Sequence, residues 1–343
     1  MMKYLKFGVL IVALVSLFTA CSDDDDDSED LIGNWVRMSD FDGVARSEAM
    51  SFVIGNKGYI CMGYNGKNRL KDLWEYNNDG DYWTQKADFT GTPRSAGVGF
   101  SIGSIGYIGT GYDGVNYLND FWAYDPSSNS WTKKADLVVN GDTTLGRSDA
   151  VGFALNNYGF VGTGYNDRWL KDFYRYDPAT DSWRQITSIL GTKRMGASSF
   201  IIGGNAYVVG GYNNDTYNYD FYMFTPQGDS GVWTKKRDIK DSNKDESYDD
   251  NYKIIRAYAA AFSINSKGYL TGGSNGSILS DTWEYNPTTD LWVKKSYFEG
   301  AARQRAVALT FSDKAIVATG TSSSYRFDDC WKFMPDDESN TND

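Results

Sequence analysis

A set of residues recurs six times along this chain at intervals of about 50 residues, and this repeat constrains the fold more than any other feature. Each copy opens with an arginine, which precedes a small residue by three positions and a phenylalanine or leucine by six. The opening arginines are Arg46, Arg94, Arg147, Arg194, Arg256 and Arg303. Each copy then carries a glycine and an aspartate, at Gly63, Gly111, Gly164, Gly211, Gly273 and Gly320 and at Asp72, Asp120, Asp172, Asp220, Asp281 and Asp329. One repeated structural unit therefore accounts for most of the chain.

The residues between these landmarks read as four short β-strands in each copy, as the second copy illustrates. The innermost strand is expected from Arg94 to Phe100, with small residues where neighbouring units crowd a central axis. The second strand ends at Gly111-Tyr112, and the third begins at Asp120 with aromatic residues at a period of two. The fourth starts at Trp131. The sequence thus predicts an all-β fold of six similar sheets.

This repeat resembles the blade of a kelch-type β-propeller, and the resemblance covers nearly all of residues 34–335. It implies a six-bladed propeller with binding loops on one face. The glycine doublet typical of kelch repeats survives only as Gly210-Gly211 and Gly272-Gly273, whereas other copies carry threonine before the glycine, as in Thr110-Gly111, or methionine, as in Met62-Gly63. Kelch propellers serve as enzymes, adhesins and scaffolds alike, so the resemblance leaves function open.

The last copy lacks its fourth strand, because residues 336–343 are acidic and polar and contain no tryptophan. Trp35, in contrast, is a fourth-strand tryptophan with no third strand before it. We therefore expect the N-terminal strand to complete the last blade, which removes an open sheet edge. Residues 336–343 are expected to form a disordered acidic tail.

Residues 1–20 read as a targeting segment, in which Lys3 and Lys6 precede an apolar run that ends at Cys21. The run resembles the signal peptide of bacterial lipoproteins, which implies lipidation at Cys21. Residues 21–33 carry five consecutive aspartates and are expected to form an acidic tether. This stretch resembles the export signal of surface lipoproteins in Bacteroidetes, which implies an outer-membrane protein displayed at the cell surface. A periplasm-facing anchor remains the alternative.

Charge and composition exclude several function classes. Removal of residues 1–20 moves the net charge from −11 to about −13, so nucleic acid is not an expected partner. The chain contains no histidine, which excludes Ser-His-Asp catalysis and imidazole metal sites, including the copper chemistry of galactose oxidase, a kelch-propeller enzyme. The polar stretch 241–252 lacks the glycine and glutamate of a calcium loop. No cofactor and no metal are predicted.

Besides Cys21, the chain contains two cysteines, Cys61 and Cys330. Both stand at strand positions that are apolar in other copies, so they are expected to be small buried residues. A disulfide between the first and last blades stays open, because sequence does not show whether the geometry allows it.

The candidate binding residues are departures from the repeat. Trp169 lies in the loop between the second and third strands, and the adjacent copies carry Tyr117 and Tyr217 at that position. Asp113, Asn166, Asp167 and Asn213 lie close by in sequence. Such rings could stack on sugars while amides and carboxylates bind hydroxyls, or they could cap their own loops. The six opening arginines could hold an acidic ligand at the channel mouth, but the repeated aspartates favour internal pairing.

Three functions are consistent with these features. The first is a non-catalytic module at the cell surface that binds a glycan or a protein, with membrane contact only through the lipid anchor. The second is an enzyme similar to sialic acid mutarotases, which are kelch propellers that need no metal and act through arginine and carboxylate groups. The third is a structural part of an envelope complex. The sequence favours the binding module.

Overall fold

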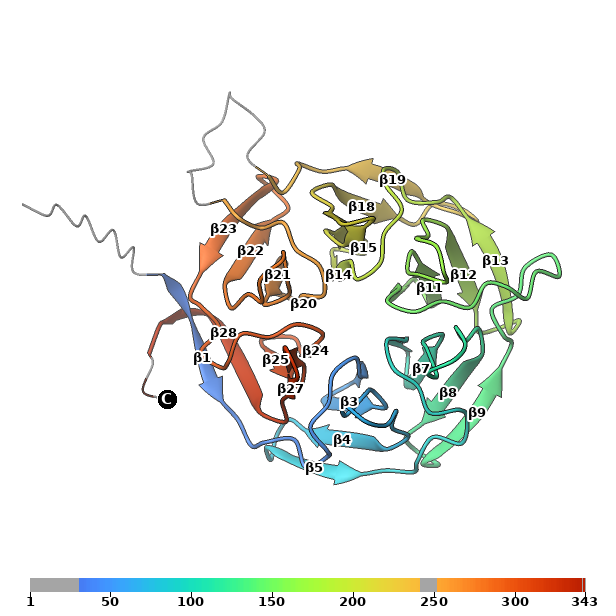
Figure 1. Ribbon diagram of the computed structural model, residues 1–343, viewed down its shortest axis with the longest axis horizontal. Coiled ribbons are helices and arrows are strands. Elements are labelled where there is room, and N and C mark those ends of the chain that lie inside the picture. The colour runs from blue at the N-terminus through green and yellow to red at the C-terminus, as the bar shows by residue number, and fades with distance from the viewer. Residues whose placement is uncertain (1–30, 241–251, 341, 343) are drawn as a thin grey trace, which may run out of the picture. The chain divides into compact units, whose positions relative to one another are not determined.

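A computed structural model describes residues 31–240, 252–340 and 342 of the chain. In this part the chain forms six four-stranded antiparallel sheets, arranged as the blades of a β-propeller (Figure 1). No helix in the described residues is long and apolar enough to cross a membrane. The predicted all-β, six-bladed architecture is confirmed. The segment 241–251, where a calcium loop was considered, lies outside the described residues, as do residues 1–30 with Cys21.

Five blades take their four strands in chain order, from the innermost strand outward. The first three blades are β2 (Met50–Ile54), β3 (Lys57–Cys61), β4 (Leu73–Asn77) and β5 (Tyr82–Gln85), then β6 (Val98–Ile102), β7 (Ile105–Gly109), β8 (Phe121–Asp125) and β9 (Ser130–Lys134), then β10 (Val151–Leu155), β11 (Tyr158–Gly162), β12 (Phe173–Asp177) and β13 (Ser182–Ile186). The next two are β14 (Ser198–Ile202), β15 (Asn205–Val209), β18 (Phe221–Thr225) and β19 (Val232–Lys235), then β20 (Ala260–Ile264), β21 (Lys267–Thr271), β22 (Thr282–Asn286) and β23 (Leu291–Lys295).

The sixth blade joins the two ends of the described chain, as predicted. Its strands, from the axis outward, are β24 (Val307–Thr310), β25 (Ala315–Ala318), β28 (Cys330–Glu338) and the N-terminal β1 (Ile32–Arg37). Trp35 faces Phe333 across the β1–β28 pair and is fully buried, with its ring 4.8 Å from that of Phe298. Aromatic burial of this size gives the closing strand a strong apolar anchor.

The strand bounds differ from the expectation in two places. The opening arginines precede the innermost strands, because β6 begins at Val98, four residues after Arg94. The predicted disordered tail is wrong for its first residues, since β28 continues to Glu338, which pairs with Ile32. Beyond Phe333 this strand has only β1 as a neighbour, so the absent N–H of Pro335 leaves no second ladder incomplete.

A closed belt of six backbone hydrogen bonds links the blades around the axis. Each is donated by the residue two positions after an opening arginine to the carbonyl of its counterpart in the preceding blade, at 2.7–3.1 Å. The six residues are Glu48, Ala96, Asp149, Gly196, Tyr258 and Arg305, and all have φ between 51° and 62°. We call these residues the axial belt. The left-handed backbone turns each N–H toward the neighbouring blade.

A second belt explains the recurring glycine. In every blade the repeated glycine donates its N–H to the carbonyl of the next opening arginine, as Gly111 does to Arg147 at 2.7 Å. Gly111 has φ +98°, and a Cβ there would lie 2.8 Å from the carbonyl oxygen of Ser95. The preceding residue needs only φ near 60°, as in Thr110 and Gly210. The second glycine therefore recurs in every copy, whereas the first position carries threonine or methionine in four copies. In the other two, a Cβ at Gly210 or Gly272 would lie 2.3 or 2.4 Å from the carbonyl oxygen of the next opening arginine.

Both cysteines of the propeller are free, buried thiols. Cys61 packs in the core cluster around Met50 and Leu73, whereas Cys330 packs in a different cluster with Ile316. The prediction of small buried residues is confirmed, and the structure contains no bridge between them.

Two short hairpins, β16 (Tyr212–Asn213) with β17 (Thr216–Tyr217) and β26 (Thr321–Ser322) with β27 (Tyr325–Arg326), lie in the loops between second and third strands. These loops share one face of the propeller with the connections between blades. The connection that enters a blade ends where the innermost strand begins, and the loop after the second strand starts beside that point, because Val98 of β6 pairs with Gly109 of β7. We call this side the loop face. It carries the residues considered below.

Candidate functional site

The six opening arginines are buried and paired with the repeated aspartates. Their exposed fractions are 0–2%. Arg147, for example, donates to both carboxylate oxygens of Asp172, at 2.8 and 3.1 Å, and to the carbonyls of Thr163 and Leu145. Its guanidinium also stacks over the ring of Tyr174, 5.1 Å from the centroid. The pairing expected from the repeat is observed, and these arginines present no surface to a ligand.

Three side chains of the axial belt form a charged cluster that the sequence analysis missed. Nη1 of Arg305 donates to Oε1 of Glu48 at 2.7 Å and to Oδ1 of Asp149 at 2.9 Å. The guanidinium carbon lies 4.0 Å from the ring centroid of Tyr258. Arg305 and Asp149 belong to the sixth and third blades, which are opposite in a ring of six. The cluster therefore spans the axis of the propeller.

This axial cluster is partly exposed, with side-chain exposures of 21% for Arg305 and 15% for Asp149. Burial raises the pKa of Asp149, as does the charge of Glu48, although Arg305 opposes both. Burial alone would lower the pKa of Arg305, but Asp149 and Glu48 raise it overall. A carboxyl group with a raised pKa beside a fixed cation is an arrangement suited to proton exchange.

The signal for the axial cluster was present in the repeat. The positions two residues after the opening arginines carry glutamate, alanine, aspartate, glycine, tyrosine and arginine in turn, although the residue that follows each of them is always alanine or glycine. Because the side chain at this position differs in every copy, the repeated fold does not depend on its chemistry. The sequence shows no run of carboxylates outside the repeat at these positions, yet Glu48 and Asp149 meet Arg305 at the axis because the blades bring residues distant in sequence together.

In five of the six blades, the loops between second and third strands carry aromatic or arginine side chains around the axial cluster, and we call these residues the rim. They are Tyr64, Arg69, Tyr112, Tyr117, Tyr165, Trp169, Tyr212, Tyr217, Tyr325 and Arg326. In each loop the residue after the repeated glycine pairs with the residue at the position of Tyr117, Trp169 and Tyr217, as Tyr112 does with Tyr117. The ring of Tyr117 lies 5.1 Å from that of Tyr112 in its own loop and 5.9 Å from that of Tyr165 in the next blade. The rim thus continues from one blade to another.

Trp169 and Tyr217 take part in the same rim but pack mainly within their own loops. The ring of Trp169 lies 5.5 Å from that of Tyr165, and its Nε1 is buried without a described partner. The ring of Tyr217 lies 5.3 Å from that of Tyr212. Both side chains are partly buried. This is the loop-capping arrangement considered in the sequence analysis, and it does not remove the exposed part of either ring from contact with a ligand.

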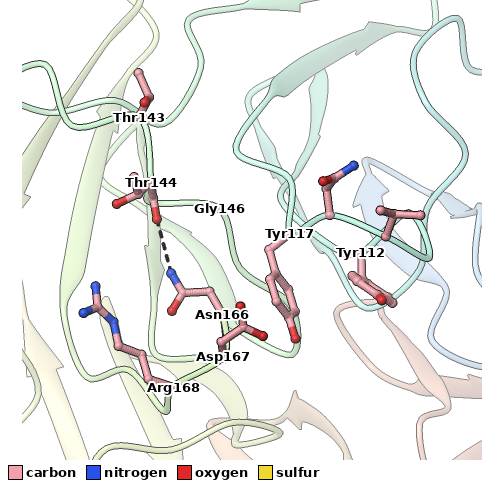
Figure 2. Close-up of a pocket in the computed structure, with 10 residues that line it drawn as sticks. Tyr112, Tyr117, Thr143, Thr144, Gly146, Asn166, Asp167 and Arg168 are labelled. Carbon is pink, nitrogen blue, oxygen red and sulfur yellow. Dashed lines mark hydrogen bonds between the residues drawn. The ribbon is translucent and has the colours of Figure 1, made fainter.

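An open pocket of about 430 Å³ lies between the second and third blades on the loop face (Figure 2). Tyr112 and Tyr117 line one side, and Asn166, Asp167 and Arg168 line the other. Thr143 and Thr144, from the insertion between these blades, close the end, where Asn166 donates to the carbonyl of Thr144 at 3.2 Å. Burial raises the pKa of Tyr117, as does Asp167. Two rings facing amide, carboxylate, guanidinium and hydroxyl groups match the composition of a sugar site.

A second pocket, of about 480 Å³, lies between the first and second blades and shares Val115 and Asn116 with the first. Lys67, Arg69 and Asp113 line it. Of the predicted binding residues, Tyr117, Asn166 and Asp167 thus meet in one pocket and Asp113 lines its neighbour. Trp169, Tyr217 and Asn213 line neither of these two pockets.

Residues 31–240 and 252–340 contain no group of three or more side chains placed to hold a metal ion.

Six blades, a closing N-terminal strand and a loop face of this kind define a six-bladed β-propeller. Residues 39–211 match the family described as the KLHDC2/KLHL20/DRC7 Kelch-repeats domain, and residues 255–297 match the Kelch motif. The chain belongs to the Kelch-repeat family. The solved structure of YjhT superposes with a TM-score of 0.70 at 17% identity, covering 85% of this chain and 95% of YjhT, which supports the fold.

Similar sequences include the N-acetylneuraminate epimerase of Pasteurella multocida (strain Pm70), 25% identical over 51% of this chain and 40% of that enzyme. The N-acetylneuraminate epimerase of Shigella sonnei (strain Ss046) is 31% identical over 40% of this chain and 31% of the enzyme. A putative F-box/kelch-repeat protein of Arabidopsis thaliana is 30% identical over 38% of this chain and 33% of its own length. The matches thus span less than half of these relatives, among which an enzyme and a repeat protein of another kind both occur.

Proposed function

We propose that this protein is a carbohydrate-binding propeller that holds a glycan on its loop face. The observation that carries the proposal is the pocket between the second and third blades, where the ring of Tyr117 faces Asn166 and Asp167. Aromatic faces bind the apolar face of a sugar ring, while amides and carboxylates hydrogen-bond its hydroxyls. The pocket is open and polar, which suits a hydrated ligand rather than an apolar one.

The placement of the rim supports a glycan over a folded protein partner. The pocket is concave, and its two tyrosine rings are partly buried and packed against neighbouring rings, so these rings are positioned before binding. Preformed aromatic platforms reduce the entropy cost of binding a flexible chain of sugars. Large protein interfaces instead expose contiguous apolar area. The exposed large apolar side chains of the described residues are not confined to the loop face, because they include Val44, Val115, Leu190 and Tyr325 there but also Tyr82, Val232 and Val293 on outer strands.

A glycan array followed by titration calorimetry tests the proposal. The purified protein should bind a defined set of glycans, and Tyr117→Ala should weaken that binding by about 1–3 kcal/mol, the scale of a lost aromatic anchor. Tyr82→Ala is a matched control, because Tyr82 is a half-exposed tyrosine on the outer strand β5. Equal affinity of wild type and Tyr117→Ala would place the ligand elsewhere.

A second candidate function is the metal-independent interconversion of sugar anomers or epimers, of the kind that the N-acetylneuraminate epimerases perform by name. The axial cluster favours it, because Arg305 can polarise a substrate oxygen while Asp149, whose pKa is raised, exchanges a proton. The limited coverage of these relatives keeps this a second candidate.

NMR exchange between the anomers of N-acetylneuraminate separates the two functions. Catalysis predicts faster exchange with protein than without it, and a large loss in Asp149→Asn. Exchange at the uncatalysed rate would exclude the enzyme for this substrate and leave the binding module.

We further propose that the protein is a lipoprotein anchored through Cys21 in the outer membrane and displayed at the cell surface, as in Bacteroidetes. The proposal rests on the sequence of residues 1–30, where basic residues and an apolar run precede Cys21 and five aspartates follow. Cys21→Ala should abolish lipid labelling and release the protein from membranes. Protease treatment of intact cells should digest the wild-type protein, and protection until lysis would argue against surface display.

A further inference from the structure

Arg69 is a cation on the loop face whose side chain forms no salt bridge with a described residue. Its backbone pairs with that of Tyr64, but its side chain makes no hydrogen bond with any residue that the structure describes, and its Nε is buried without an acceptor. Its guanidinium lies between two tyrosine rings, 5.3 Å from the centroid of Tyr64 and 4.8 Å from that of Tyr112. Arg175 pairs instead with Asp229, and Arg305 pairs with two carboxylates. Arg326, at the same loop position of the sixth blade, forms no salt bridge with a described residue but donates to the carbonyls of Tyr64 and Ser324.

The guanidinium of Arg69 is positioned by residues of its own blade and of the next blade. Two rings fix its plane, and Gly114 of the next blade leaves room for Nη1, because a Cβ at Gly114 would lie 2.8 Å from that atom. Gly114 has φ +107°, so the turn itself also requires glycine. A planar, immobilised guanidinium loses little entropy when it binds an oxyanion.

Arg69 lines the second loop-face pocket together with Lys67, and neutral donors surround it. Thr92, Asn68 and Asn116 also line the pocket, together with Pro93 and Val115. Asp113 is the acidic residue of this pocket, but its carboxylate is already hydrogen-bonded to the backbone N–H groups of Val115 and Asn116 and to the Asn116 amide. These bonds and the charge of Arg69 outweigh burial and lower the pKa of Asp113. Two cations against one engaged carboxylate leave the pocket positive within an acidic protein.

We infer that the pocket of Arg69 binds the anionic group of an acidic oligosaccharide, a carboxylate or a sulfate, whose neighbouring sugars extend into the pocket of Tyr117. The two pockets share Val115 and Asn116, so one chain of sugars can cross from one to the other over that turn. The inference rests on the proposed function and names its ligand class. The axial Arg305 is a poorer anion site, because Glu48 and Asp149 already offset its charge.

Titration calorimetry with three oligosaccharides of equal length tests the inference. The probes are hexagalacturonate, which is carboxylated, a carrageenan hexasaccharide, which is sulfated, and maltohexaose, which is neutral. The wild-type protein should bind at least one anionic probe at least tenfold more tightly than maltohexaose, and this preference should shrink as salt increases. The anionic probe that binds more tightly identifies the group.

Three variants locate the site. Arg69→Met keeps the stacked chain but removes the charge, so it should lose about tenfold or more in affinity for the anionic probe. Arg69→Lys should retain part of that affinity. Arg184→Met removes the same charge from the exposed outer strand β13 and should change little.

The outcomes separate this inference from the function on which it rests. A loss of affinity for the anionic probe in Arg69→Met but not in Arg184→Met supports the inference. Equal affinity of wild type and Arg69→Met for the anionic probe overturns it, and so does a wild-type protein that binds neutral glycans as tightly as anionic ones. Absence of binding to all glycans overturns the proposed function as well.

Discussion

The backbone N–H of Glu48 donates to the carbonyl oxygen of Arg305 at 3.1 Å and so joins the first blade to the last at the axis. The same two residues also meet through their side chains, at 2.7 Å. One pair thus takes part in closing the ring and in building the charged centre of the loop face. The backbone contact that closes the ring and the side-chain contact of the axial cluster therefore involve the same two residues.

Removal of a buried arginine should unfold the propeller more readily. Arg194 is fully buried and pairs with Asp220 at 2.6 Å. Arg194→Ala should lower the free energy of unfolding by about 3–5 kcal/mol, because it leaves a carboxylate without its partner. Arg184→Ala breaks the exposed pair with Asp229 and should cost less than about 1 kcal/mol. Urea titrations measure both, and an unchanged midpoint for Arg194→Ala would contradict the structural role of the repeat.

The glycine doublet offers a test of backbone conformation. Gly111→Ala places a Cβ where φ is +98° and Ser95 lies in contact, so it should cost more than about 1 kcal/mol of stability. Thr110→Gly should stay within about 1 kcal/mol of wild type, because it relieves a β-branched residue at φ 58° while removing a buried methyl group. Thermal melting distinguishes the two, and equal losses would contradict this account of the variable first position.

Acid should destabilise the propeller through the repeated aspartates. Burial would raise the pKa values of Asp72, Asp120, Asp172 and Asp329, but hydrogen bonds and charge from their arginine partners lower them below the ordinary value. Their ionised forms therefore stabilise the fold above about pH 4, and this stabilisation is lost as pH falls through the lowered values. Urea titrations between about pH 7 and pH 2 measure it. Asp120→Asn should be less stable than wild type near neutrality, and the difference should narrow in acid; a constant difference would contradict the assignment.

The sequence could predict the blades and the ring closure because both follow from periodic residues. Trp35 without a third strand, for instance, could only complete the last sheet. Burial of the opening arginines also followed from their pairing with aspartates at a fixed spacing. The axial cluster could not be predicted in this way, because Glu48, Asp149 and Arg305 are far apart in sequence and meet only when six blades close. Likewise, the sequence shows Arg69 only as the first copy's residue at the position that Tyr117 holds in the second, and the lack of an acceptor for its Nε is visible only in three dimensions.

The rim residues should differ in their effect on glycan binding. Tyr117 lines the pocket, whereas Trp169 contributes to the rim beside Tyr165 and does not line it. Tyr117→Ala should therefore lower glycan affinity more than Trp169→Ala, with little change in melting temperature for either. Calorimetry and thermal melting of the two variants check this. A larger loss in Trp169→Ala would move the site toward the third and fourth blades.

The central claim is that the loop face binds a glycan, and titration of the wild-type protein and Tyr117→Ala with the strongest glycan from an array tests it most directly. The account predicts saturable binding by the wild type and a loss of about 1–3 kcal/mol in the variant, with Tyr82→Ala unchanged. No saturable binding to any glycan, or equal binding by all three proteins, would contradict it.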